Sequence, residues 1–246
     1  MFVARLVSTV ATTGVRMRAA ALAVGVTTAI AIAYEALRQD LTAGSALALL
    51  LFYGGSTAII IAFSVWTATD IGLPSLLCLS TLDTRSRLVR WVILGVGLGF
   101  VLAGASVLLS GGADSPLQPW FWRRIQTPLG VALFSARAAL LEETFFRLFL
   151  IPFLVSVALR TRAPRHRLEL RSGNARATRA AVVAGPLLIL LACTMSSAMF
   201  GLAHPFNPVG AVALAPLLAV AYLWGGWESS VTAHFVANMI LLQFYY

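Results

Sequence analysis

Three charged residues, Glu142, Glu143 and Arg147, lie close together in a strongly apolar stretch of the chain. A charged side chain at the centre of a membrane helix costs about 2.5–3.5 kcal/mol, and such residues usually face a bundle interior or a watery cavity. Glu143 and Arg147 are four residues apart, so on a helix they share a face and can form an ion pair. Glu142 points about 100° away and lacks that partner, which makes its carboxylate the candidate general base.

Two further polar pairs follow at helical spacing in apolar surroundings, Phe200 with His204 and His234 with Asn238. His234 and Asn238 would lie on one helix face, where both can donate hydrogen bonds to a carbonyl oxygen that becomes negative. His204 closes its apolar run and could act as a second base or hold a water molecule. The three groups together supply the parts needed for a hydrolytic reaction.

Each of these groups also has a purely structural explanation. Glu143 and Arg147 could form an ion pair that only locks two helices together, and His204 could cap a helix end at the membrane surface. Interhelical hydrogen bonds from an imidazole or an amide are worth only about 1 kcal/mol in membranes. Glu142 has no cation in its own helix turn, so the catalytic interpretation is strongest for that residue.

The composition of the chain is that of a membrane protein. Of its 246 residues, 59% are hydrophobic and 11% are charged, whereas soluble domains have about 45–50% and about 25%. Because a bilayer core needs about 20 apolar helical residues, we predict an all-α polytopic transmembrane bundle of about seven spans that encloses a polar catalytic cavity. The expected spans lie near residues 19–37, 43–69, 88–111, 128–159, 180–204, 209–225 and 227–245.

The formal net charge of +9 comes entirely from Arg residues in excess over acids. Most of them lie in short segments between apolar spans, which indicates membrane orientation and argues against nucleic-acid binding. They gather before the first span, in the 70–90 segment and in the 160–179 segment. Seven spans would put all three segments on the cytoplasmic side. We therefore expect an integral protein of a bacterial plasma membrane with a cytoplasmic N-terminus.

Other residues are expected at the membrane surface or in the packing. Arg137 should reach the headgroups from the outer end of its span, and Glu35 and Glu228 should be interfacial. Pro152 should kink or break its helix. A headgroup belt is expected at Trp120, Phe121, Trp122, Arg123 and Arg124, and packing thiols rather than a disulfide at Cys78 and Cys193.

The ordered motifs E-E-x-x-x-R, F-x-x-x-H and H-x-x-x-N resemble those of the CPBP family of intramembrane proteases. That family includes the CAAX prenyl endopeptidases of eukaryotes and many bacterial relatives. The resemblance covers roughly residues 120–245, the expected catalytic core, whereas 1–110 is supported only by its hydrophobic spans. Both parts belong to a single integral-membrane domain over 1–246.

The resemblance implies a catalytic role for each motif. Glu142 would activate the attacking water with the help of His204, while Glu143 and Arg147 would hold the pocket. The histidine and the asparagine of the last motif would stabilise the tetrahedral oxyanion. The implied activity is that of an endopeptidase which hydrolyses a peptide bond of a membrane-anchored or lipidated protein near its C-terminus.

A metal could occupy the same residues. Glu142, His204 and His234 could hold Zn²⁺ with an open coordination position, and the family has been described both as metalloendopeptidases and as glutamate-type proteases. The chain has no H-E-x-x-H helix, and Asn238 is a poor zinc ligand. We therefore favour a glutamate-type mechanism that requires no cofactor.

Two other functional classes stay open at this point. A non-catalytic membrane scaffold or bacteriocin-immunity-type protein could share the fold, and it would not need the carboxylate of Glu142. A small transporter could use Glu142, His204 and His234 as a proton relay, but no inverted repeat of the kind common in transporters is evident. In each case the lipid bilayer is the surrounding medium, and only the protease needs a membrane-protein substrate.

Overall fold

The computed structural model describes residues 2–38, 42–70, 73, 84–109, 127–159, 175–204 and 208–244. Within these ranges every regular element is a helix and no strand is found. The prediction of an all-α bundle is therefore confirmed. Three features named in the sequence analysis lie outside the described residues: the belt expected at 120–124, Cys78 and most of the Arg-rich 160–179 segment.

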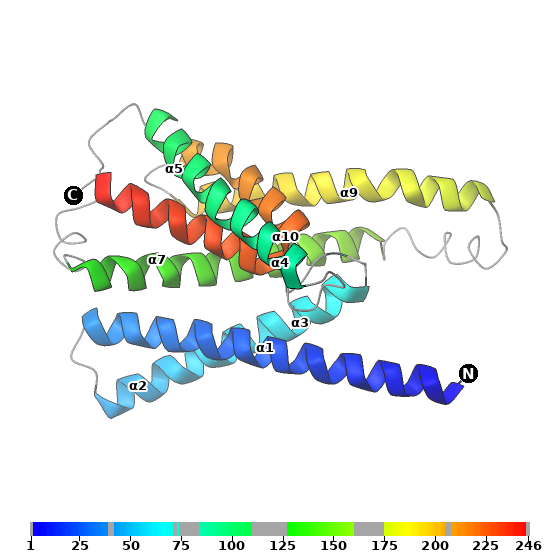
Figure 1. Cartoon of the computed structure of the whole chain (residues 1–246), viewed down its shortest axis with the longest axis horizontal. Coiled ribbons are helices and arrows are strands. Elements are labelled where there is room, and N and C mark those ends of the chain that lie inside the picture. Colours follow the sequence, from blue (N-terminus) through cyan, green and yellow to red (C-terminus); the bar gives the residue numbers. More distant parts are fainter. Residues whose placement is uncertain are drawn as a thin grey trace.

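The N-terminal part consists of two long helices that pack against each other (Figure 1). The first is α1 (Phe2–Arg38). The second begins with α2 (Ala43–Leu49), whose first turn is capped by the Thr42 side chain. It continues without a break through the π-helical turn η1 (Leu50–Gly54) into α3 (Gly55–Asp70).

A further continuous helix is formed by α4 (Thr84–Arg90), the π-helical η3 (Trp91–Gly97) and α5 (Leu98–Leu109). It packs closely against the last helix of the chain. A Cβ atom placed on Gly99 would lie 2.6 Å from Cβ of Val236. The missing side chain of Gly99 is therefore what lets the two backbones approach.

The central helix is made of α7 (Pro128–Glu143), the π-helical η4 (Thr144–Leu150) and a last stretch over 151–159. The side chain of Thr127 caps its first turn. Pro152 does not interrupt this helix, so the expected break is wrong, whereas a kink at this position stays a prediction. A proline ring clashes with the carbonyl group of the preceding turn, and the wider π-helical turn before Pro152 provides room for it.

The C-terminal part consists of α9 (Ala175–Leu202) and α10 (Pro208–Phe244). α10 is a helical hairpin, because Gly226 has φ 79° and ψ −179°. Only glycine adopts this conformation at low cost. The two arms lie side by side, since the hydroxyl oxygen of Ser230 is 3.1 Å from the carbonyl oxygen of Leu218.

Helices long and apolar enough to cross a membrane occur at five places in the described residues, which supports a bilayer environment. The central helix over 128–159 is not among them because it carries four charged side chains. The bent α10 is counted once. The total of about seven spans therefore stays a prediction. The five candidates are Ala20–Leu37, Gly44–Val65, Leu88–Leu109, Gly185–Leu202 and Pro208–Leu242.

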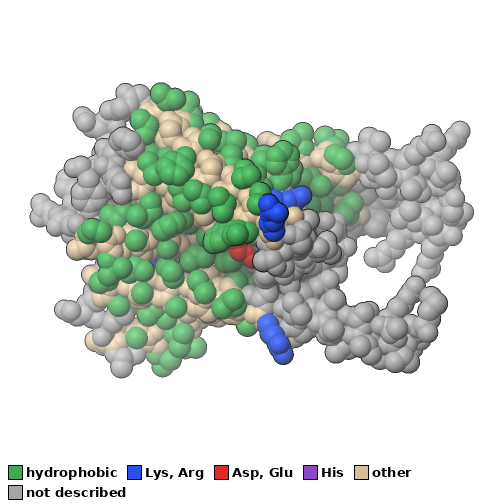
Figure 2. All heavy atoms as spheres, in the orientation of Figure 1, with side chains coloured by type: hydrophobic (Ala, Val, Ile, Leu, Met, Phe, Trp, Pro, Cys, Tyr) green, Lys and Arg blue, Asp and Glu red, His purple; other side chains and the backbone are tan. Residues whose placement is uncertain are grey.

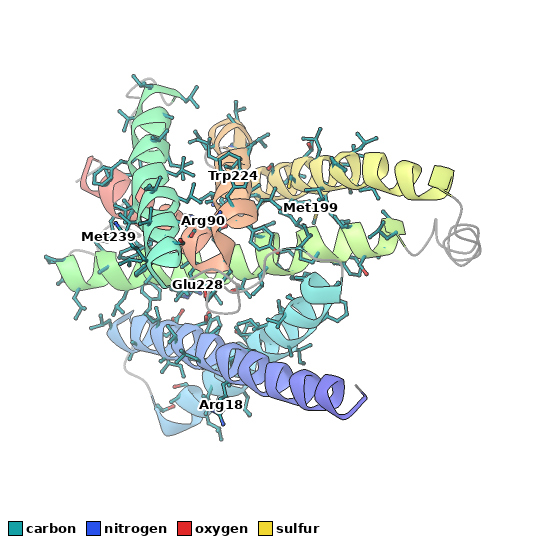
Figure 3. All side chains as sticks on the ribbon, turned by 45° about the vertical axis from the view of Figure 1, so that its right-hand side comes forward. Arg18, Arg90, Met199, Trp224, Glu228 and Met239 are labelled. Carbon is teal, nitrogen blue, oxygen red and sulfur yellow. The ribbon has the colours of Figure 1, made fainter. Side chains whose placement is uncertain are left out.

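The central helix occupies the middle of the bundle, with α1 on one side of α7 and α10 on the other (Figure 1). Apolar side chains cover most of the described surface in Figure 2, and the basic side chains visible on this face lie at one edge of it. The turn of the α10 hairpin lies next to one basic side chain, that of Arg90. A guanidinium nitrogen of Arg90 donates to the carbonyl oxygen of Trp224 at 3.1 Å. Figure 3 shows Glu228 in the same region and Met239 farther away along α10.

Candidate active site

The charged motif lies where α7 passes into η4, at the centre of the bundle. Glu142 and Glu143 end α7, and Arg147 belongs to η4. The side chains of Glu143 and Arg147 are 0% and 1% exposed, and Arg147 Nε lies 3.3 Å from Glu143 Oε2. The predicted ion pair therefore forms, away from solvent and lipid. The side chain of Glu142 is 29% exposed and turns in another direction.

The carboxylate of Glu142 faces two imidazole rings. His204 directly follows α9 and places Nε2 at 3.3 Å from Glu142 Oε2. His234 in α10 places Nε2 at 3.8 Å from the same oxygen. The Nδ1 atom of His204 lies 2.7 Å from the carbonyl oxygen of Phe200. Since a carbonyl group only accepts hydrogen bonds, Nδ1 carries a hydrogen and Nε2 is left to exchange a proton with Glu142.

Glu143 is held on both of its oxygens. Oε1 lies 2.9 Å from His234 Nδ1, and Oε2 accepts a hydrogen bond from the Ser230 hydroxyl group beside the ion pair with Arg147. In contrast, Oε2 of Glu142 makes no hydrogen bond to the described residues. Two adjacent carboxylates thus have different surroundings: Glu143 accepts hydrogen bonds on both oxygens, whereas the buried Oε2 of Glu142 faces two imidazole nitrogens.

The ring of Phe200 covers the ion pair and joins the three motifs. Its centroid lies 4.4 Å from the guanidinium carbon of Arg147, which is a favourable cation–π distance. The His204 ring lies at 4.3 Å and the edge-on His234 ring at 5.7 Å from the same ring. Phe200 therefore separates the charged groups from lipid and holds both imidazoles in place.

The structure brings the predicted residues of all three motifs to one place. Direct contacts join Glu142, Glu143, Arg147, His204 and His234. Asn238 lies one turn beyond His234 on α10 and is partly exposed. Within the described part of the chain, no hydrogen bond joins its side chain to the two carboxylates.

Two serines that the sequence analysis did not single out also belong to this region. Ser230 lies one turn before His234 and binds Glu143. Ser196 lies one turn before Phe200, and its hydroxyl group donates to the carbonyl oxygen of Phe146 in η4 at 2.6 Å. The four-residue spacing to a motif residue is the signal that could have found them, but serine is common in membrane helices.

A second pair of charges, Glu35 and Arg137, joins α1 to α7. Arg137 Nη2 lies 3.6 Å from Glu35 Oε1, with side chains that are 24% and 7% exposed. The same nitrogen donates to the hydroxyl oxygen of Tyr53 at 2.7 Å. Both side chains therefore pair inside the bundle instead of standing alone, and their depth relative to the headgroups stays a prediction. Pairing inside the bundle reduces the cost of keeping either charge away from water.

The described residues do not form a preformed metal site. No group of three or more His, Cys, Asp or Glu in this part of the chain is arranged to hold a metal ion. The residues proposed as zinc ligands from the sequence, Glu142, His204 and His234, contact one another through one carboxylate oxygen. Cys193 is a free, half-buried thiol.

Comparison with known proteins gives no relative for this chain. No protein-family model, no curated protein and no solved structure matches it. The function must therefore be argued from the geometry of the site and from the motif resemblance.

Proposed function

We propose that this protein is an integral-membrane endopeptidase of the glutamate type, in which Glu142 is the general base. One observation carries the proposal. The partly exposed carboxylate of Glu142 faces the Nε2 atoms of His204 and His234, while its neighbour Glu143 is fully occupied by buried partners. A structural ion pair needs only Glu143 and Arg147. A second, partly exposed carboxylate that faces two imidazoles is an arrangement suited to general acid–base catalysis.

In the attack step, Glu142 takes a proton from a water molecule in the pocket. The water oxygen forms a bond to the carbonyl carbon of the substrate, and the carbonyl π electrons move to the oxygen. Asn238 lies one turn beyond His234 on α10 and would donate a hydrogen bond to that oxyanion, while Nε2 of His234, which carries no hydrogen when Nδ1 donates to Glu143, would accept a hydrogen bond from the attacking water. A donor of this kind contributes about 2.7–4 kcal/mol to transition-state stabilisation.

In the breakdown step, the oxyanion electrons re-form the carbonyl group and the C–N bond breaks. The leaving nitrogen takes a proton from the Glu142–His204 pair. His204 suits this role because its Nδ1–H is fixed on the Phe200 carbonyl oxygen, which aims Nε2 into the pocket. The second proton of the attacking water passes from the new carboxyl group to the amine, so the products are a carboxylate and an ammonium group, and the pair returns to its starting protonation.

The substrate in this proposal is a membrane-anchored or lipidated protein that is cut near its C-terminus, as the resemblance to the CPBP family implies. The apolar helices support a bilayer as the medium. We place the protein in a bacterial plasma membrane with its N-terminus in the cytoplasm, on the basis of the Arg distribution. No step of the proposed reaction passes through a metal ion.

The experiment compares the termini of membrane proteins by mass spectrometry in host cells that lack this protein. The cells are complemented with wild type, with Glu142→Gln, or with Glu228→Gln. The last variant changes an acid of α10 outside the site and serves as the matched control. We expect a precursor to lose its C-terminal tail with wild type and with Glu228→Gln, and to stay intact with Glu142→Gln.

The proposal would be contradicted if the membrane proteins of the host had the same C-termini in cells with wild type and in cells with Glu142→Gln. If wild type and Glu142→Gln also restored growth equally, a role as a non-catalytic scaffold would explain the results. Proton-coupled solute flux in vesicles that depended on Glu142, without cleavage, would instead point to a transporter.

A further inference from the structure

Ser230 extends the last motif of the site by one helical turn. It is fully buried and lies four residues before His234, which itself lies four residues before Asn238. On one face of the second arm of α10, the chain therefore presents a hydroxyl group, an imidazole and an amide in succession. The hydroxyl group is the member that the motif resemblance does not include.

The hydroxyl group of Ser230 connects three segments of the chain. It donates to Oε2 of Glu143 in α7, and its oxygen lies 3.1 Å from the carbonyl oxygen of Leu218 in the first arm of α10. The second contact exists only because the hairpin folds back at Gly226. Because a hydroxyl group has one hydrogen, which Ser230 gives to Glu143, the Leu218 carbonyl group is a close neighbour of the hydroxyl oxygen and not a second acceptor at the same time.

The contact on Oε2 determines where Oε1 of Glu143 points. A carboxylate can rotate about its last side-chain bond, which has a broad torsional preference. Arg147 Nε approaches Oε2 at 3.3 Å but makes no hydrogen bond among the described residues. The Ser230 hydroxyl group is therefore the hydrogen-bond donor that fixes Oε2, and it leaves Oε1 directed at His234 Nδ1 at 2.9 Å.

We propose that Ser230 is a positioning residue that acts through Glu143 to fix the ring orientation and the tautomer of His234. With Oε1 of Glu143 accepting from Nδ1–H, the Nε2 atom of His234 faces Glu142 as an acceptor for the attacking water. Which ring nitrogen carries the proton is set by the hydrogen bond that the other one makes. This assignment rests on the proposed hydrolysis at Glu142.

The neighbouring Ser229 provides a matched control. It is also fully buried in α10, but its hydroxyl group donates to the carbonyl oxygen of Gly225 in its own chain segment at 2.8 Å. Serine-to-alanine substitution at either position removes one buried hydroxyl group. Only the change at Ser230 removes a contact to the site.

The test uses full-length protein in lipid nanodiscs and isotope-labelled histidine. The chain has three histidines, so the ring-nitrogen signals can be resolved by nuclear magnetic resonance and assigned by comparison with a His234→Gln spectrum. In wild type, in Ser229→Ala and in Ser230→Thr, we expect a single neutral tautomer of His234 with its hydrogen on Nδ1. In Ser230→Ala, a second population with the hydrogen on Nε2 should appear.

The same variants are compared in cleavage of the precursor tail that the terminus experiment identifies. Ser230→Ala should lower kcat by up to about 100-fold, the loss typical of a misplaced catalytic group, with little change in KM. Ser230→Thr should restore most of the rate, and Ser229→Ala should match wild type. A single His234 tautomer in Ser230→Ala would overturn the assignment, as would equal rates for Ser230→Ala and Ser229→Ala. If Glu142→Gln cleaves as fast as wild type, the proposed function fails instead, and the tautomer measurement still decides the role of Ser230.

Discussion

Glu142 and Glu143 are adjacent in the sequence, yet their side chains have different partners and different exposure. Glu143 lies in a closed cluster with Arg147, His234 and Ser230, and Glu142 opens toward the space between two imidazoles. A carboxylate that is saturated by buried donors contributes mainly to structure and positioning. A carboxylate with an available oxygen can take up a proton during a reaction.

This difference predicts that one isosteric substitution lowers mainly the stability and the other lowers mainly the cleavage rate. Glu143→Gln leaves the Arg147 charge buried without its counter-charge, which should lower the free energy of unfolding by about 3–5 kcal/mol. Glu142→Gln should change it little, because the side chain is partly exposed, but should reduce the cleavage rate by about 10²- to 10⁴-fold. Thermal unfolding in detergent micelles gives the first quantity, and cleavage of the identified precursor gives the second.

The double variant Glu143→Gln/Arg147→Met serves as the control for the stability measurement. It removes both charges, so it should regain much of the stability that Glu143→Gln loses. The account of the buried pair would be wrong if Glu142→Gln and Glu143→Gln destabilised the protein equally.

The motif spacing anticipated the contacts among the two carboxylates, Arg147 and the two histidines, but Asn238 makes no hydrogen bond to either carboxylate in the described part of the chain. The roles of Ser230 and Phe200 could not be predicted in the same way. Ser230 meets Glu143 across 87 positions of the chain, and Phe200 covers Arg147 in another helix. Such contacts depend on how the helices pack, and periodicity within one helix does not contain that information.

Among the elements, the turn at Gly226 and the π-helical η4 shape the site most directly. Gly226 folds α10 back, so that Leu218 and Ser230 can meet. The prediction of separate spans over 209–225 and 227–245 anticipated two arms from the gap between two apolar runs. The positive φ angle at Gly226 and the π-helical turn before Pro152 could not be predicted from hydropathy.

Close packing of α5 on α10 holds the arm that carries His234. The nearest atoms to a Cβ on Gly99 would be Val236 Cβ at 2.6 Å and the Ala233 carbonyl oxygen at 2.9 Å. Gly99→Ala should therefore force the helices apart and lower the free energy of unfolding by about 1–3 kcal/mol. Gly104→Ala in the same helix is the control, because nothing lies within 4 Å of its Cβ position.

Both glycine variants are measured by thermal unfolding in detergent micelles, with cleavage as a second readout. Gly104→Ala should be unchanged or slightly more stable, since alanine favours the helix by up to about 1 kcal/mol. If the two variants were equally stable, α5 and α10 would have to lie farther apart at Gly99 than the structure shows.

At the scale of the whole molecule, the site lies deep between the two ends of the bundle. Glu142 is 14 residues beyond the start of α7 at Pro128, which is about 21 Å along a helix. His234 is eight residues beyond Gly226 and ten before the end of α10, or about 12 Å and about 15 Å. In the proposed reaction, substrate and water would therefore meet Glu142 far from both ends of the bundle.

Composition and hydropathy predicted this overall architecture well, because long apolar runs have few alternatives in a bilayer. They did not reveal that Arg137 and Glu35 pair with each other inside the bundle. A single charge near a helix end does not reveal whether a partner on another helix will meet it. That partner is fixed by the packing of α1 on α7.

Hydrolysis that depends on Glu142 is the central claim, and it can be measured before the substrate is identified. Purified wild type or Glu142→Gln is mixed with detergent-solubilised membranes from cells that lack the protein, in water enriched in heavy oxygen. Mass spectrometry then searches for new C-termini that carry one heavy oxygen atom from the attacking water. We predict such labelled termini with wild type and none above background with Glu142→Gln. The absence of labelled termini with wild type, or equal labelling with both proteins, would contradict the account.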